Sequence, residues 1–226
     1  MVEFLNQIMP NVMGKLPELW KCTGQTLSMM LYSGIISFVI GIVLGVVLTV
    51  TKKGGILQNK IIYGILDKII NIFRSIPFVI LMAALLPFTR ALVGTAIGTK
   101  GAMVPLVFGT VPFFTRQVET ALAELDHGLI EAAQAMGNSP FEIIFRVYLK
   151  ESIPALTRGT TITAISLVGL TAMAGAVGGG GLGDFAIRYG HQRNQTDVTW
   201  VTVLLMLILV SVLQGAGDLI IKKTRH

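Results

Sequence analysis

Three long stretches of this chain contain no charged residue, and they restrict its fold more than any other feature. They run from residue 22 to 51, from 159 to 183 and from 198 to 217. A helix crosses the core of a lipid bilayer in about 20 residues, so each stretch is long enough to span it. With 53% hydrophobic residues and a mean hydropathy of +0.73, the chain is too apolar for a soluble domain of this size. We therefore predict an all-α integral membrane protein.

Two shorter charge-free stretches, 75 to 89 and 101 to 115, are also predicted to lie in spans. Their helices must extend past Arg74 and Arg116, whose long side chains reach toward the headgroups. Pro77 is expected to kink the first of these helices near its inner end, because proline lacks the N–H that an interior position requires. The prediction is one transmembrane domain over residues 1–226, with five spans and a polar loop. The spans lie at about 24–51, 67–89, 98–119, 154–178 and 198–221, and the loop at about 120–153.

The charges favour one orientation in the membrane. If the loop at 120–153 is cytoplasmic, ten of the 18 Lys and Arg residues lie at inner ends and six at outer ends, with Lys68 and Arg74 near the inner end of the second span. Such a bias is typical of cytoplasmic loops. The N-terminus is then outside and the basic tail at 222–225 is inside, beside anionic lipid. Asp67 is expected to pair with Lys68 at the membrane interface. The basic residues flank spans and form no stripe with aromatics, so no nucleic acid partner is predicted.

Reactive residues are too sparse for most kinds of catalytic site. Cys22 is the only cysteine, and the three histidines are scattered, so a disulfide, a metal site and a Ser/His/Asp arrangement have no support. Gly14 and Lys15 are followed by Leu16, which excludes a phosphate-binding loop of the Walker type. We predict no catalytic residue, no metal and no cofactor in this chain, which is not expected to be an enzyme.

The polar loop is predicted to contain two short helices. Asp126 is a suitable N-cap for the first helix, and Gly137 supplies a left-handed stop. The second helix should begin at Ser139, with Pro140 at its first position and Glu142 completing a capping box. The first helix carries mainly small side chains, so it is suited to enter a groove on a partner.

A glycine-rich segment follows the fourth span. Six glycines lie between residues 175 and 183, and they permit tight turns and close backbone packing there. A phosphate cradle is the alternative, but no Lys-Ser or Lys-Thr pair follows, so we discount it.

The polar loop also carries a spaced pattern of Glu-Ala-Ala, three residues, Gly, nine residues, a β-branched residue, one residue and Leu. It occupies Glu131, Ala132, Ala133, Gly137, Val147 and Leu149. The pattern resembles the cytoplasmic signature of ATP-binding-cassette (ABC) importer permeases. The segments at 74–78, 104–106, 167–169 and 171–183 look like those of methionine-importer permeases, and the similarity runs over roughly residues 20 to 222. One departure is Lys150, where many permeases have proline.

The resemblance implies an ABC importer permease fold in which a cytoplasmic coupling helix lies between spans three and four. Its implied contacts with the ATPase are Glu131, Ala132, Ala133, Gln134, Met136, Gly137 and Pro140. It further implies a homodimer in a bacterial inner membrane, two cytoplasmic ATPase subunits that bind ATP and Mg, and an extracytoplasmic methionine-binding lipoprotein. Transport would proceed by alternating access, with ATP hydrolysed on the partner.

The implied substrate is methionine, in the L form, with the D form left open. Ser166, Thr171 and Met173 are the candidate residues of the substrate pathway, because span four combines polar and thioether side chains near the middle of the membrane. Packing between helices is an alternative role for Met173. Two other functions stay open: a permease for another amino acid, and an ion-coupled carrier. The carrier would require internal duplication or intramembrane acids, and neither is evident.

Overall fold

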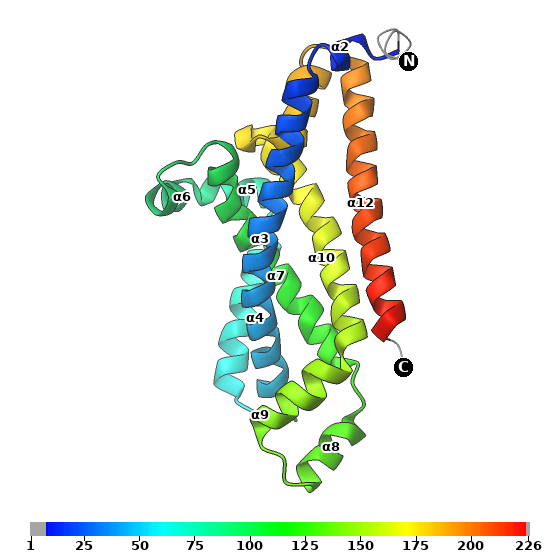
Figure 1. Ribbon diagram of the computed structural model, residues 1–226. Helices are drawn as coiled ribbons and strands as arrows, with labels where there is room; N and C mark the ends of the chain where they lie inside the picture. Colours follow the sequence, from blue (N-terminus) through cyan, green and yellow to red (C-terminus); the bar gives the residue numbers. More distant parts are fainter. Residues whose placement is uncertain (1–7, 225–226) are drawn as a thin grey trace. The chain divides into compact units, whose positions relative to one another are not determined.

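The computed structural model describes residues 8–224, and every regular element in this range is a helix. The chain divides into two compact units. Unit 1 comprises Met1–Ile35, Pro77–Phe108 and Ala164–Leu213, and unit 2 comprises Ile36–Ile76, Gly109–Thr163 and Gln214–His226. Four long helices contribute residues to both units: α3 (Leu16–Thr51), α7 (Gly98–Ala123), α10 (Ile153–Ala174) and α12 (Thr196–Thr224) (Figure 1).

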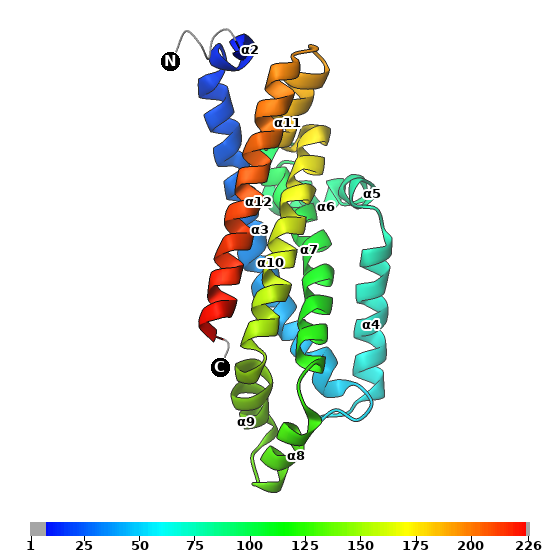
Figure 2. The same ribbon diagram turned by 90° about the vertical axis from the view of Figure 1, so that its right-hand side faces the viewer.

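Unit 1 contains two apolar cores. Its shorter elements are α2 (Pro10–Met13), α5 (Phe78–Ala84), α6 (Leu86–Val93), η2 (Gly175–Gly179), α11 (Gly181–Phe185) and η3 (Ala186–His191). One core joins α3, α5, α7 and α10 through Met29, Met82, Ala102, Leu106, Leu167 and Ala174. The other joins α2, α3, α11 and α12 through Val12, Leu19, Cys22, Leu182, Phe185 and Val198. Figure 2 shows α11 beside the N-terminal part of α12.

The glycine-rich segment of unit 1 makes the close backbone turn that its sequence predicts. Gly178, Gly180 and Gly181 have positive φ angles of 93°, 76° and 81°. Gly183 lies so near α10 that a Cβ atom there would be 2.3 Å from the Ala172 carbonyl oxygen. Only glycine permits both the conformation and the approach.

Two side chains of α3 complete the N-terminus of α11. The Gly181 N–H donates to Gln25 Oε1 at 2.9 Å, and the Leu182 N–H donates to Thr26 Oγ1 at 2.8 Å. The first N–H groups of a helix have no partner within the helix, so these contacts satisfy two of them. They also join segments that are 156 residues apart in the sequence.

Unit 2 is built around a single apolar core. It contains α4 (Lys60–Ser75), α8 (His127–Ala135), α9 (Pro140–Glu142) and η1 (Ile143–Leu149) besides its parts of the long helices. The core residues are Val50, Phe114, Val118, Leu122, Ile130, Ala133, Ile143 and Tyr148. Gly41 and Gly45 let α3 approach α7, since a Cβ atom on either would fall 2.6 Å or less from Phe114 or Val118.

Among the described residues, three helical segments are long and apolar enough to cross a membrane: Leu16–Thr51, Ile153–Gly179 and Thr196–Thr224. A fourth results if α6 and α7, which meet at a bend of 118°, are counted as one span. The helix α7 continues through both of its prolines, Pro105 and Pro112.

The segment 67–89, predicted as one kinked span, does not form a single helix. The helix α4 ends at Ser75, Ile76 is extended with φ −84° and ψ 123°, and α5 begins only at Phe78. The residue before a proline is driven out of the helical conformation, so Pro77 breaks the helix instead of bending it. A second break at Leu85 separates α5 from α6.

Candidate functional site

The candidate site is the segment between α7 and α10, where α8 forms a short helix with a cap at each end. The Asp126 carboxylate accepts a hydrogen bond from the Gly128 N–H at 2.9 Å. At the other end, the Gly137 and Asn138 N–H groups donate to carbonyl oxygens of α8 at 2.9 and 3.2 Å. Gly137 has φ +79°, so this is the left-handed Schellman stop. Both predicted caps are confirmed.

The second helix of the loop begins with the predicted capping box. Glu142 Oε2 accepts hydrogen bonds from the Ser139 N–H and hydroxyl, each at 2.9 Å, and the Glu142 N–H donates to Ser139 Oγ at 3.4 Å. The bond from the Ser139 backbone, followed by that from its hydroxyl, lowers the pKa of the Glu142 carboxyl from its ordinary value. Two helix starts are thus defined within fourteen positions, 126 to 139.

One face of this loop is packed into the core of unit 2. Ile130 and Ala133 of α8 are 5% and 2% exposed, and they lie in one cluster with Val118 and Leu122 of α7. Tyr148 of η1 belongs to the same cluster, and its burial raises the pKa of the phenol. Burying an isoleucine contributes about 2 kcal/mol. One face of α8 is therefore held against α7 by packed side chains.

The opposite face of α8 is open. Of the seven residues predicted to contact an ATPase, six are exposed: Glu131, Ala132, Gln134, Met136, Gly137 and Pro140. Ala133 is the exception, because it lies on the packed face described above. Its small side chain fits α8 against α7 and is not presented to a partner. The Glu-Ala-Ala pattern alone could not show which of its residues lie on the packed face of α8 and which on the open face.

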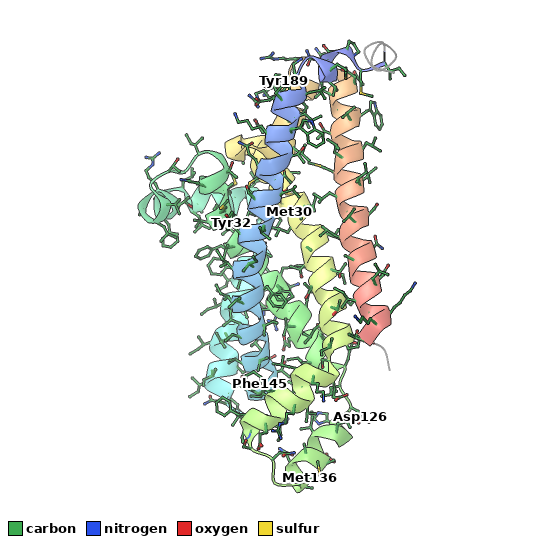
Figure 3. The ribbon with its side chains drawn as sticks, in the orientation of Figure 1. Met30, Tyr32, Asp126, Met136, Phe145 and Tyr189 are labelled. Atoms are coloured by element: carbon green, nitrogen blue, oxygen red, sulfur yellow. The ribbon has the colours of Figure 1, made fainter. Side chains whose placement is uncertain are left out.

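Two exposed aromatic residues extend this surface, and the sequence analysis did not select them. Phe141 is 73% exposed and Phe145 is 64% exposed, and Met136 in the same loop is 74% exposed. Figure 3 shows Met136 at the turn that follows α8 and Phe145 farther along the loop, on η1. The spacing of four residues between the two phenylalanines places them on one helical face, and this signal was available in the sequence. We define Met136, Phe141 and Phe145 as the apolar rim of the loop.

The three candidate pathway residues of α10 do not lie together. Thr171 is 1% exposed, and its hydroxyl donates to the Val168 carbonyl oxygen at 2.7 Å. Met173 is 49% exposed, and Ser166 is half-buried. Gly169 is exposed, and no atom lies within 4 Å of the position of a Cβ atom there. Positions 166, 169 and 173 follow helical spacing, so Ser166, Gly169 and Met173 form one open stripe that excludes Thr171.

A protein-family model matches most of the length of this chain. Residues 25–226 match the model of the family described as "Binding-protein-dependent transport system inner membrane component". The chain is 51% identical over 211 residues to the methionine import system permease protein MetP of Bacillus subtilis, covering 93% of this chain and 94% of that protein. It is 47% identical over 204 residues to the probable D-methionine transport system permease protein MetI of Vibrio cholerae, covering 90% and 91%.

Comparison with solved structures gives the same fold. A chain of the MetNI methionine ABC transporter in an inward-facing conformation superposes with a TM-score of 0.90 at 44% identity. The superposition covers 94% of this chain and 99% of that one.

Proposed function

Since this chain belongs to the family of binding-protein-dependent transport system inner membrane components, we propose that it is the membrane permease subunit of an ABC importer for methionine. Its similarity at 44 to 51% identity to permeases and a transporter of methionine supports this substrate. The observation that carries the proposal is the capped helix α8, which is open on one face and packed against α7 on the other.

We propose that α8 is the coupling helix and that it enters a groove on a cytoplasmic ATPase. The small and polar residues on its open face leave room for a close approach. The apolar rim supports this assignment, because exposed aromatic residues in a polar loop are typical of a protein–protein contact. In this arrangement the N-terminus is outside, the C-terminus is cytoplasmic, and five segments cross the bacterial inner membrane. The fifth crossing is the broken segment made by α4 and α5.

The proposed assembly is a homodimer of this chain with two ATPase subunits, which bind ATP and Mg. A methionine-binding lipoprotein delivers the substrate at the outer face. Closure of the ATPases draws the two coupling helices together and opens the pathway outward, and hydrolysis reverses this. Moving a two-state equilibrium from 1:99 to 99:1 requires about 5.5 kcal/mol of differential binding. In this scheme the ATPases supply that free energy through α8.

We propose that the stripe of Ser166, Gly169 and Met173 lines the substrate pathway. The stripe combines a hydroxyl, an open backbone position and a polarizable thioether, and a thioether makes adaptable contacts with an apolar amino-acid side chain. Thr171 is assigned a packing role because its hydroxyl is bonded within its own helix.

Thiol labelling tests this pathway in a Cys22→Ser background. We expect Met173→Cys to react with a small maleimide and saturating methionine to slow the reaction about fivefold, because a bound ligand covers the stripe. The matched control is Thr171→Cys, which should react slowly with or without methionine because position 171 is buried. Equal labelling of Met173→Cys in the presence and absence of methionine, in an assembly that takes up methionine, would exclude it from the pathway.

The function itself is tested by uptake in a methionine auxotroph whose other methionine routes are deleted. We expect cells with this chain, its ATPase and its binding protein to accumulate labelled methionine, and cells without this chain to accumulate none. Competition with unlabelled L-methionine, D-methionine and other amino acids then defines the substrate range. Equal uptake with and without the chain would refute methionine as the substrate. Uptake that needs no partner ATPase would favour an ion-coupled carrier.

A further inference from the structure

A polar network connects α4 to α7 within unit 2. The Arg116 guanidinium of α7 donates to the carboxylate of Asp67 and to Asn71 Oδ1 at 3.0 Å, both on α4. Its other terminal nitrogen donates to Glu119 Oε2 at 2.5 Å. Asn71 in turn donates to Asp67 Oδ2 at 3.2 Å. Asp67 therefore pairs with an arginine 49 positions away, and not with Lys68 as its sequence neighbourhood suggested.

Most of the surface of α4 is not buried. Ile70 is the only buried residue among its sixteen. The face with Ile61, Ile65 and Ile72 is 55 to 74% exposed, as expected for a surface that meets lipid. The hydrogen bonds of Arg116 therefore join α4 to α7 in a region where few residues of α4 are buried.

The network also has a desolvation cost, because its side chains are charged and partly buried. Arg116 and its two acidic partners are 17 to 29% exposed, and they lie at the inner ends of two predicted spans. A charged side chain in a span is expensive unless it is paired, so such residues usually have a specific role. Arg116 Nε is buried and has no hydrogen-bond partner within residues 8–224, so the guanidinium is held by its terminal nitrogens.

Arg116 lies close to the part of α7 that packs on α8. It lies two residues before Val118 and six before Leu122, the residues that pack on α8. Within one stretch of α7, one side thus contacts the loop of the candidate site and another contacts α4.

We propose that Arg116 is a positioning residue that fastens α4 to α7, so that α4 moves together with α7 and α8 when a partner displaces α8. The consequence is that α4 moves directly when an ATPase displaces α8. This inference rests on the proposed function, since it deepens the mechanism by which α8 acts.

Distance measurements on the assembled transporter test the rigid connection. Spin labels at Lys68→Cys in α4 and His127→Cys in α8, both exposed positions of unit 2, are placed in a Cys22→Ser background. With Arg116 present, we expect one narrow distance distribution that is the same without nucleotide and with the ATPases trapped in their closed state. With Arg116→Gln, the distribution should broaden and shift between the two states. A narrow, unchanged distribution in Arg116→Gln would overturn the proposal.

Coupling is the second readout. We expect Arg116→Gln to lower methionine taken up per ATP hydrolysed by about tenfold, within the usual range for residues that transmit coupling. Arg116→Lys should recover part of the loss because an ammonium can still pair with Asp67. In a double-mutant cycle, adding Asp67→Asn to Arg116→Gln should cause little further loss, since both changes cut the same contact. Additive losses would contradict a shared role.

The controls separate a positioning role from a general defect. Lys68→Gln changes an exposed charge on the same helix and should leave coupling unchanged. Co-purification of the ATPase with Arg116→Gln shows that the assembly forms, and loss of co-purification would mean a role in folding and would overturn the proposal. If the unmodified chain takes up no methionine, the proposed function fails. If it takes up methionine and Arg116→Gln is equally coupled, only the connection between α4 and α7 fails.

Discussion

Replacing Gly183 with alanine is expected to destabilise the folded chain strongly, lowering both its yield and its Tm. A Cβ atom at this position would lie 2.3 Å from the Ala172 carbonyl oxygen and 2.7 Å from Ala172 Cα. Both are backbone atoms of α10, so no side-chain rotation relieves the clash, and overpacking of this kind costs about 3 kcal/mol. Because α11 is held to α3 on its other side by Gln25 and Thr26, it has little freedom to retreat. The yield of purified protein and its Tm in detergent measure the effect.

The matched control for Gly183→Ala is Gly24→Ala. Gly24 lies in the helix α3 of the same unit, and no atom comes within 4 Å of the position of its Cβ atom. Alanine is favoured over glycine in a helix by about 1 kcal/mol, so the control should be neutral or stabilising. If both variants had the same yield and Tm as the unmodified chain, the prediction that α11 lies too close to α10 for a Cβ atom at position 183 would be contradicted.

Replacing Gly137 with valine is expected to uncouple ATP hydrolysis from uptake. Gly137 has φ +79° and open space around its Cβ position, so the change tests backbone conformation alone. A residue other than glycine pays about 1–2 kcal/mol in the left-handed region, and β-branching adds to this. The stop of α8 should therefore unwind and misplace Met136 and Pro140, which flank it. Methionine uptake per ATP hydrolysed in reconstituted vesicles measures the loss, which should be at least about tenfold.

Gly137→Asn separates conformation from side-chain size. Asparagine adopts the left-handed region more readily than other residues with a side chain, so this variant should retain most of the coupling. Co-purification of the ATPase with both variants shows whether docking persists. Normal coupling in Gly137→Val would show that the left-handed stop of α8 is not needed for coupling.

Features encoded by neighbouring residues were the ones that the sequence predicted well. The N-cap at Asp126, the stop at Gly137 and the capping box at Ser139 each depend on side chains within a few positions of the backbone groups that they satisfy. The glycines at 175–183 indicated a tight turn for the same reason, since positive φ angles and close approaches need no knowledge of distant segments.

Features that depend on distant segments were predicted poorly. Nothing near Asp67 indicates a partner 49 residues away, so the adjacent Lys68 was the natural choice. The direction of Ala133 was equally hidden, because alanine fits both a packed face and a docking face. Pro77 was placed correctly as an irregularity but was expected to bend one helix, whereas the structure separates α4 from α5 there. The sequence therefore predicts where the helices of unit 2 begin and end better than what each contacts.

The hydrogen bonds from α11 to Gln25 and Thr26 limit which parts of unit 1 are free to rearrange. Thr26 is 1% exposed, so its hydrogen bond with the Leu182 N–H is shielded from water. Breaking these contacts without replacing them would leave two amide N–H groups unpaired, at a cost of about 1–3 kcal/mol for each buried group. We therefore expect the beginning of α3 and the glycine turn before α11 to move as one body, with any hinge of this unit located elsewhere.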